Sequence, residues 1–269
     1  VIGLISMPMI VLLAKAFTFD GAISLQNFAN LAGRGDRELL NISVWQATLN
    51  TLRNVAISAT IAVGFGSLVS YLLSRTHRTR RAKFSARTLD LLFLIPVGIS
   101  SVVLGFGYLI TFGGGPLPLR ASWLVVPIVQ ALMALPLVIR LIYPALISIG
   151  KEHREAASLA GANSRQTWWH IESRMIRNVI LTAIGYALIV SIGEFGAASL
   201  LAYGDQATLP TVLFALISRP GQTNYGMAMA VSACLILLTL AMVFAVSLRK
   251  RPSLRQQVQK ARQLFSSAR

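Results

Sequence analysis

Charged residues are scarce in this chain. Of its 269 residues, 25 are Lys or Arg and nine are Asp or Glu, so that 13% are charged, against about 25% in a typical soluble domain. The polar surface is therefore too small to cover a soluble fold of this length. A hydrophobic content of 55% also excludes an intrinsically disordered chain. Cys234 is the single cysteine, which excludes an intramolecular disulfide framework and a cysteine-based zinc site.

The residue patterns of enzymes and metal sites are missing as well. The sequence has no Gly-rich phosphate loop of the GxxxxGK[ST] type, so we expect that the chain does not hydrolyse a nucleotide itself. His77, His153 and His170 show no metal-ligand spacing and are expected to be solvated loop residues. We predict no catalytic residue, no metal and no cofactor in this chain. If the chain moves a solute uphill, it therefore needs a partner or an ion gradient.

The basic residues lie in short runs between long apolar stretches. The net charge is +16, but a protein that binds nucleic acid gathers its Lys and Arg on one folded face. Short basic runs between apolar stretches are instead typical of a membrane protein. We therefore expect a lipid membrane, and not nucleic acid, to surround or bind this chain.

Six apolar segments are candidates for membrane-spanning helices, each of which needs about 20 mostly apolar residues. We predict spans at residues 1–17, 52–74, 90–112, 122–146, 178–202 and 226–248. The first segment is short, and a buried core helix stays open as its alternative. A short surface helix is expected at Leu209–Ile217. Because the sequence does not begin with Met, we expect that residues precede Val1.

The distribution of Lys and Arg predicts the orientation of these spans. Segments 75–87, 151–177 and 249–269 hold six, five and seven of the 25 basic residues. Short loops rich in Lys and Arg stay in the cytoplasm, so we predict that these segments and both chain ends are cytoplasmic. The domain boundaries follow as a transmembrane domain at 1–248 and a basic tail at 249–269. The tail can lie on an anionic leaflet, with a retention or regulatory role as the alternative.

The long loop at residues 147–177 is the most informative segment. Residues 151–160 are mainly good helix formers. Gly161 then permits a turn, and Asn163 or Ser164 can cap a second helix. We predict a helix–turn–helix hairpin that lies on the cytoplasmic membrane face.

Two interpretations of this hairpin stay open from the residues alone. Ala156, Ala157 and Ala160 are expected to be exposed on the first helix, where their small side chains would let the groove of another protein accept it. The alternative is an amphipathic hairpin at the membrane interface, anchored at headgroup level by Trp168 and Trp169.

The same loop carries a pattern that belongs to a known family. Glu155-Ala156-Ala157, three residues, Gly161, nine residues and Ile171 resemble the EAA loop of permease subunits of binding-protein-dependent ABC importers. The pattern of that loop is E-A-A-x3-G-x9-I-x-L-P. The sequence departs from it at the end, where Ser173 and Arg174 stand in place of Leu and Pro.

The resemblance implies a fold and a mechanism. It implies an all-α membrane protein with six transmembrane helices of the ABC importer type I permease fold, in the plasma (inner) membrane of a bacterium. The chain would form the solute pathway and couple to a separate cytoplasmic ATPase, which binds ATP and magnesium. A solute-binding protein outside the membrane and a second permease half or copy would complete the transporter.

Five residues of the loop acquire roles from the resemblance. Glu155 would contact the ATPase or cap the helix, and Gly161 would make the turn. Ala156 and Ala157, together with Ala160, would pack in the ATPase cleft. The alternatives from other classes of function are a secondary transporter and a membrane scaffold or channel without ATP coupling.

Further segments are similar to permeases for iron(III) and thiamine. These are Ser191–Gly196 (SIGEFG), followed by Thr208–Pro210 (TLP), and Pro96–Tyr108. Permeases of that type are often two six-span halves fused in one chain. The resemblance therefore implies the C-terminal half of such a fusion, with a truncated single-half subunit as the alternative.

Glu194 is the one acidic residue within a predicted span, apart from Asp90 at the first position of the span 90–112. A charge at this depth costs roughly 2.5–3.5 kcal/mol on insertion scales, so Glu194 is expected to face a cavity or a partner. With Gly193 and Gly196, which loosen the helix, it is the candidate for the solute pathway, where it would favour a cationic solute. The alternative is a structural role, in which Glu194 pairs with another span, for example through Arg140, or reaches the outer interface.

Overall fold

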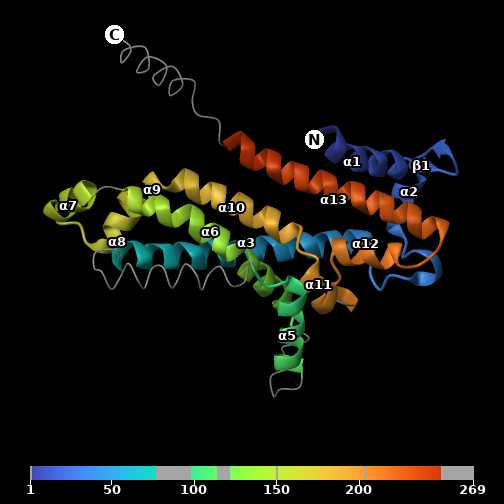
Figure 1. The fold of residues 1–269 in the computed structure, drawn as a ribbon, viewed down its shortest axis with the longest axis horizontal. Coiled ribbons are helices and arrows are strands. Elements are labelled where there is room, and N and C mark those ends of the chain that lie inside the picture. The colour runs from blue at the N-terminus through green and yellow to red at the C-terminus, as the bar shows by residue number, and fades with distance from the viewer. Residues whose placement is uncertain (1, 77–97, 114–121, 150, 203, 250–269) are drawn as a thin grey trace, which may run out of the picture.

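The structure is a computed structural model that describes residues 2–76, 98–113, 122–149, 151–202 and 204–249. Helices dominate these residues, and the longest of them run alongside one another in an elongated bundle (Figure 1). The elements are α1 (Ile2–Ala16), β1 (Thr18–Phe19), β2 (Ala22–Ile23), α2 (Gln26–Ala29), α3 (Val44–Thr76), α5 (Ser101–Gly113), α6 (Val125–Ser148), α7 (Lys151–Leu159), α8 (Ser164–Thr167), α9 (Ser173–Met175), α10 (Arg177–Ile192), α11 (Gly196–Leu201), α12 (Leu209–Ile217) and α13 (Gln222–Arg249). A π-helical turn, Trp168–Glu172, joins α8 to α9.

The centre of the bundle is formed by α3, α6 and α10, which all pack on one another. Their buried side chains are mostly small or branched and make one apolar cluster that includes Ala62, Val138 and Ala183. Glycines bring the helices close. A Cβ built at Gly66 of α3 would lie 2.6 Å from Cγ1 of Val138 on α6, so a side chain at this position would keep the two helices apart.

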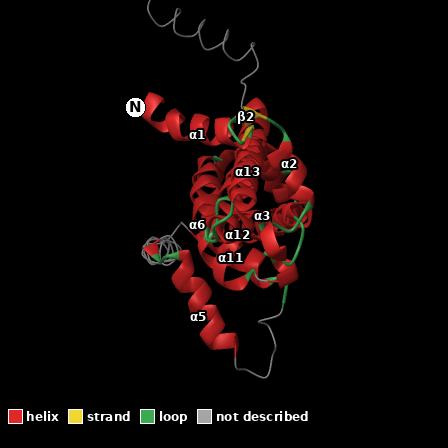
Figure 2. Ribbon diagram, turned by 90° about the vertical axis from the view of Figure 1, so that its right-hand side faces the viewer, coloured by secondary structure: helices red, strands yellow, loops and turns green. Residues whose placement is uncertain are grey.

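A second apolar cluster joins α1, the start of α3, α12 and α13. The two-residue strands β1 and β2 pair as an antiparallel hairpin beside it. In both views α5 points away from the bundle (Figures 1 and 2), and its contacts go to α11 and α6.

Three described helices are long and apolar enough to cross a membrane, by length and composition: α3, α6 and α13. The run 164–175 and α10 pass the same test together, although they are bent by 72° at the break between them. Within α1 and α5 the apolar helices are shorter, Ser6–Ala16 and Ser101–Thr111. The count of six spans stays a prediction, because residues 90–97 of the third predicted span lie outside the described residues.

The helix α3 begins at Val44, well before the predicted start at residue 52. Ser43 initiates it, since its Oγ accepts a hydrogen bond from the backbone N–H of Gln46 at 3.3 Å. Val44 and Ala47 are buried in the second apolar cluster. The first turns of α3 are therefore held by packing against α12 and the 3-10 turn at Asn30–Ala32 and not by a continuous apolar run.

The prediction of one continuous helix at residues 178–202 is wrong. In the structure α10 ends at Ile192, and α11 begins at Gly196. Glycine is among the weakest helix formers, and two glycines flank this break. The carboxylate of Glu194 also accepts a hydrogen bond from the backbone N–H of Ala197 at 3.0 Å. This bond satisfies a free donor of the new helix and favours a restart of the helix over its continuation.

The predicted surface helix at Leu209–Ile217 is confirmed as α12. Thr208 begins it with a reciprocal capping arrangement that involves Thr211, and Pro210 lies in its first turn. Proline is well tolerated there because the N–H that it lacks would have no partner within the helix.

Candidate functional site

The hairpin between α6 and α10 is built by local interactions. The helix α7 ends in a turn in which Gly161 has a φ of +79°. The N–H of Gly161 donates to the carbonyl of Ser158 at 3.0 Å, and the N–H of Ala162 donates to that of Ala157 at 2.9 Å. These two bonds form a Schellman motif, which favours glycine at the position with positive φ. The glycine turn is thus confirmed.

The second limb of the hairpin begins at Asn163, as the sequence predicts. The Asn163 side chain accepts from the N–H of Gln166 at 2.8 Å, and the Gln166 side chain accepts from the N–H of Asn163 at 2.9 Å. This capping box satisfies two backbone donors at once. The limb then continues through α8, the π-helical turn and α9 toward α10, with the bend of 72° before α10.

The surface of α7 differs from the one predicted. Glu155, Ala156, Ala160 and Gly161 are exposed, but Ala157 is only 4% exposed, so its predicted exposure is wrong. Leu159 is 90% exposed, so the surface is not flat and small. The two residues differ because they lie about 200° apart around a helix with 3.6 residues per turn, which leaves Ala157 against the molecule and Leu159 away from it.

The two tryptophans of the loop have different surroundings. Trp168 is half-buried, and its ring meets that of Tyr71 on α3 edge to face, with 4.8 Å between centroids. Trp169 is 62% exposed. Only Trp169 therefore has the exposure that the interfacial interpretation requires of both.

An ion pair joins the second limb to the end of α3. Nη2 of Arg75 donates to the two carboxylate oxygens of Glu172 at 3.0 and 3.2 Å. Glu172 is fully buried, whereas Arg75 is partly exposed. The Arg75 guanidinium also lies over the ring of Tyr71, 4.8 Å from its centroid. The ion pair could not be predicted from the sequence, because 97 residues separate its members and no local spacing connects them.

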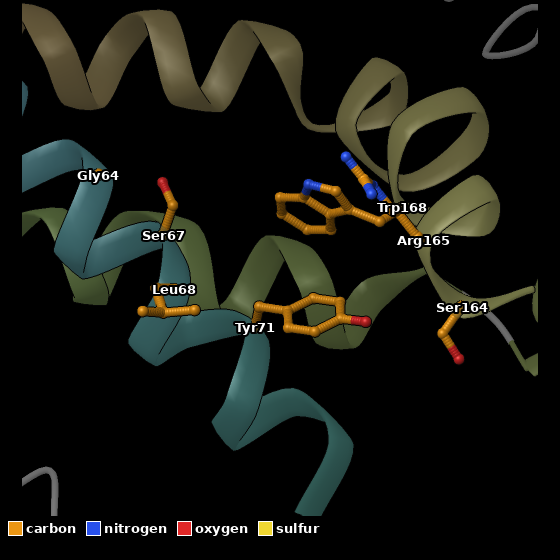
Figure 3. Close-up of a pocket in the computed structure, with 7 residues that line it drawn as sticks. All are labelled: Gly64, Ser67, Leu68, Tyr71, Ser164, Arg165 and Trp168. Carbon is orange, nitrogen blue, oxygen red and sulfur yellow. The ribbon is translucent and has the colours of Figure 1, made fainter.

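A cavity of about 520 Å³ opens beside these aromatic residues. In Figure 3 the side chains of Tyr71, from α3, and Trp168, from the second limb, lie next to each other. The lining is mostly apolar and includes residues from both elements: Gly64, Ser67, Leu68, Tyr71, Ser164, Arg165 and Trp168.

The break between α10 and α11 holds the three residues predicted to line the solute pathway. Glu194 and Gly196 are half-buried, and Gly193 is exposed. Gly196 allows α5 to approach closely, because a Cβ there would lie 3.0 Å from Cγ2 of Val102 and overlap the side chain of Ser101. In the described part of the chain, no basic side chain lies within ion-pair distance of Glu194, so the pairing with Arg140 is not observed there.

Buried polar side chains surround the same break. Oγ of Ser191, at the end of α10, lies 2.7 Å from Oγ of Ser58. Nε2 of Gln130 donates to the Ser191 carbonyl at 3.2 Å. Among the described residues, Oδ1 of Asn54 and Oε1 of Gln130 are buried without a hydrogen-bond partner. Buried amide oxygens usually have a donor, so this cluster offers two acceptor positions to a water molecule or a solute.

A signal for this cluster exists in the sequence. Asn50, Asn54 and Ser58 recur every four residues within an otherwise apolar segment, and this spacing places them on one face of a helix. Asn50 is the N-terminal residue of the stripe, and its Nδ2 donates to the carbonyls of Asp205 and Ala207 at 2.8 and 3.0 Å. This polar stripe could therefore have been predicted from the sequence.

No group of three or more His, Cys, Asp or Glu that could hold a metal ion occurs among the described residues. The hairpin and the helix break are therefore the two candidate sites. One presents an exposed surface suited to a protein partner, and the other presents a carboxylate and amide oxygens suited to hydrogen-bond donors or cations.

Comparison with known proteins points to a transport family. Residues 63–253 match the family described as "Binding-protein-dependent transport system inner membrane component". The chain is 30% identical over 217 residues to the sulfate transport system permease protein CysW of Escherichia coli (strain K12), covering 76% of this chain and 69% of that protein. It is 26% identical over 213 residues to the molybdenum transport system permease protein ModB of the same strain, covering 74% of this chain and 89% of that protein.

Two further matches are to a protein much longer than this chain and to a solved structure. The chain is 23% identical over 224 residues to the ferric transport system permease protein FbpB of Actinobacillus pleuropneumoniae. The matched segment covers 83% of this chain but 31% of that protein. The chain thus spans about a third of that relative. The chain has the same fold as a chain in the crystal structure of a bacterial alginate ABC transporter in complex with an alginate pentasaccharide-bound periplasmic protein. The TM-score is 0.69 and the sequence identity is 18%, and the match covers 91% of this chain and 88% of that one.

Proposed function

Because the chain belongs to the family of binding-protein-dependent transport system inner membrane components, we propose that it is the membrane-spanning permease subunit of an ATP-driven ABC importer. In this proposal α7 and the turn at Gly161 form the element that seats against a cytoplasmic ATPase. A solute-binding protein outside the membrane, a second permease half or copy, and ATP with magnesium on the ATPase complete the assembly. A secondary transporter or a scaffold without ATP coupling would need no such element.

The observation that carries this proposal is the exposed face of α7. Leu159 is 90% exposed at the tip of a hairpin whose backbone is fixed by a Schellman motif and a capping box. An exposed apolar side chain on a fixed support can be buried in a hydrophobic pocket of a partner, which removes its apolar surface from water and favours binding. Glu155, Ala156 and Ala160 lie exposed on the same hairpin and would form the rim of this contact.

Leu159→Ser should weaken binding of the ATPase without disturbing the hairpin. The exposed side chain supports no packing within this chain, so insertion and thermal stability should stay at the level of the unmodified protein. Co-purification of the ATPase should fall by about tenfold or more, as expected when a central apolar anchor worth about 2 kcal/mol is removed. Leu25→Ser, at a leucine that is 66% exposed between β2 and α2 and lies outside the described candidate spans, is the control. Equal co-purification for Leu159→Ser and the unmodified protein would exclude this surface as the ATPase contact.

The solute is the finer part of the proposal. The relatives are named for ferric, sulfate and molybdenum transport, so the family alone does not select one. We propose a cationic solute of the iron(III) or thiamine type, which passes Gly193, Glu194 and Gly196 at the helix break. The half-buried carboxylate of Glu194 and the free amide oxygens beside the break support this choice, because both attract cations and hydrogen-bond donors.

Glu194→Gln should lower uptake of such a solute by about tenfold, which corresponds to 1.4 kcal/mol of lost attraction. The amide keeps an oxygen in the position that accepts from the N–H of Ala197, so the start of α11 stays capped. Glu194→Ala removes both the charge and the cap and serves as the comparison. Uptake is measured in proteoliposomes and normalised to assembled complex. If Gln transports normally and only Ala fails, Glu194 acts as a cap and not in the pathway.

A further inference from the structure

We propose that Arg75 and Glu172 are positioning residues of transport, which join the hairpin to α3 so that both move as one body. This inference rests on the proposed function, in which the hairpin receives its movement from an ATPase. It adds the route by which that movement enters the membrane. Neither residue touches a solute in this proposal, and each acts through the element that carries it.

A single nitrogen of Arg75 makes the contact with Glu172, while Nε of Arg75 is buried without a hydrogen-bond partner. Both oxygens of the Glu172 carboxylate are bound by the same nitrogen of Arg75, at 3.0 and 3.2 Å. That nitrogen also lies 3.3 Å from the hydroxyl of Tyr71. Tyr71 in turn meets Trp168, which lies one helical turn before Glu172. Two residues of α3 thus hold two residues of the second limb.

The position of the pair gives it mechanical significance. Arg75 lies in the last turn of α3. Glu172 ends the π-helical turn of the second limb, just before the bend of 72° that leads into α10. Single π-helical turns are rare and are frequently found at functional sites. The ion pair therefore connects the end of one long helix to the point where the hairpin changes direction.

The energetics of burial explain why the two elements would move together. The Glu172 carboxylate is fully buried, and a buried charge that loses its partner is strongly disfavoured. A shift of the hairpin away from α3 would break the contact between this buried carboxylate and Arg75. A push on α7 by a partner therefore reaches α3 directly, and not only through the backbone into α10.

Uptake and ATP hydrolysis, measured on the same reconstituted transporter with its ATPase and binding protein, test this role. Glu172→Gln and Arg75→Gln should each lower the uptake per ATP hydrolysed by at least about fivefold, the lower end of typical coupling between sites. Co-purification of the ATPase should persist, because α7 is untouched. Arg174→Gln, at an exposed arginine two residues from Glu172, is the matched control and should keep the ratio of the unmodified protein.

A double variant keeps the test decisive if a single variant does not assemble. Arg75→Gln with Glu172→Gln removes both charges of the pair and should lower the uptake per ATP hydrolysed, as each single variant does. An unchanged ratio of uptake to hydrolysis in the double variant would overturn the proposal. So would a loss of assembled complex with a normal ratio in what remains, since this is the signature of a purely structural pair. Failure of the ATPase contact itself would appear separately, as normal co-purification in Leu159→Ser.

Discussion

Gly161→Pro should reduce solute uptake to the background level while the chain still inserts into the membrane. Gly161 has a φ of +79°, whereas proline fixes φ near −65°. Proline also lacks the N–H that Gly161 donates to the Ser158 carbonyl at 3.0 Å. The substitution therefore removes both the backbone conformation and one of the two bonds that end α7. The first limb would no longer present Leu159 at the angle that the second limb fixes.

Gly161→Asn is the control that separates conformation from composition. Asparagine tolerates positive φ better than other residues with a side chain, and a Cβ at this position meets nothing within 4 Å. This variant should keep most of the uptake and of the ATP hydrolysis stimulated by the binding protein. Both variants are compared in proteoliposomes at equal amounts of membrane-inserted chain. Normal transport by Gly161→Pro would mean that the hairpin is not the coupling element.

Gly185→Ala should destabilise the bundle by about 1–3 kcal/mol, the usual effect of forcing extra atoms into a packed core. Gly185 lies on α10 and faces Val246 of α13. A Cβ at this position would lie 2.7 Å from Cγ1 of Val246 and overlap its Cγ2. The two helices would have to separate, which removes contacts on both sides of the pair.

Val246→Ala should restore part of the stability that Gly185→Ala removes, because it deletes the two Cγ atoms nearest to the new methyl group and leaves only the Cβ of residue 246, at 2.9 Å. The midpoint of thermal unfolding of the purified protein in detergent reports the change. Gly107→Ala on α5, where a Cβ meets nothing within 4 Å, is the matched control and should leave the midpoint unchanged. A normal midpoint for Gly185→Ala, or no rescue by Val246→Ala, would contradict the close approach of α10 and α13.

Local features of the hairpin could be predicted from the sequence because local interactions create them. A glycine with positive φ and an asparagine cap act within a few residues, so the spacing of Gly161 and Asn163 was sufficient. The orientation of α7 was not predictable in the same way. The burial of Ala157 and the exposure of Leu159 depend on where the hairpin rests on the rest of the molecule, and the alanine pattern alone could not separate Ala157 from the exposed Ala156 and Ala160.

The long-range features lay outside the reach of pattern analysis. Hydropathy showed an apolar run across residues 178–202 but could not show that α5 packs against Gly196 at a break in the helix. Arg75 counted only as one more basic loop residue, because its partner Glu172 is far away in the sequence. The start of α3 was missed for a related reason, since its first turns are stabilised by α12 and the turn at Asn30–Ala32 and not by their own hydrophobicity.

The helix α3 is the longest of the described helices. Its 33 residues correspond to about 50 Å at 1.5 Å per residue, against a hydrocarbon core of about 30 Å. Near its beginning, Thr51 accepts a hydrogen bond from the N–H of Leu209 at 2.9 Å, and near its end Arg75 binds Glu172. A tilt of about 10° around the middle of such a rod swings each end by about 4 Å in opposite directions. A lever of this kind converts a small rotation at one membrane face into a displacement as large as an atom's diameter at the other.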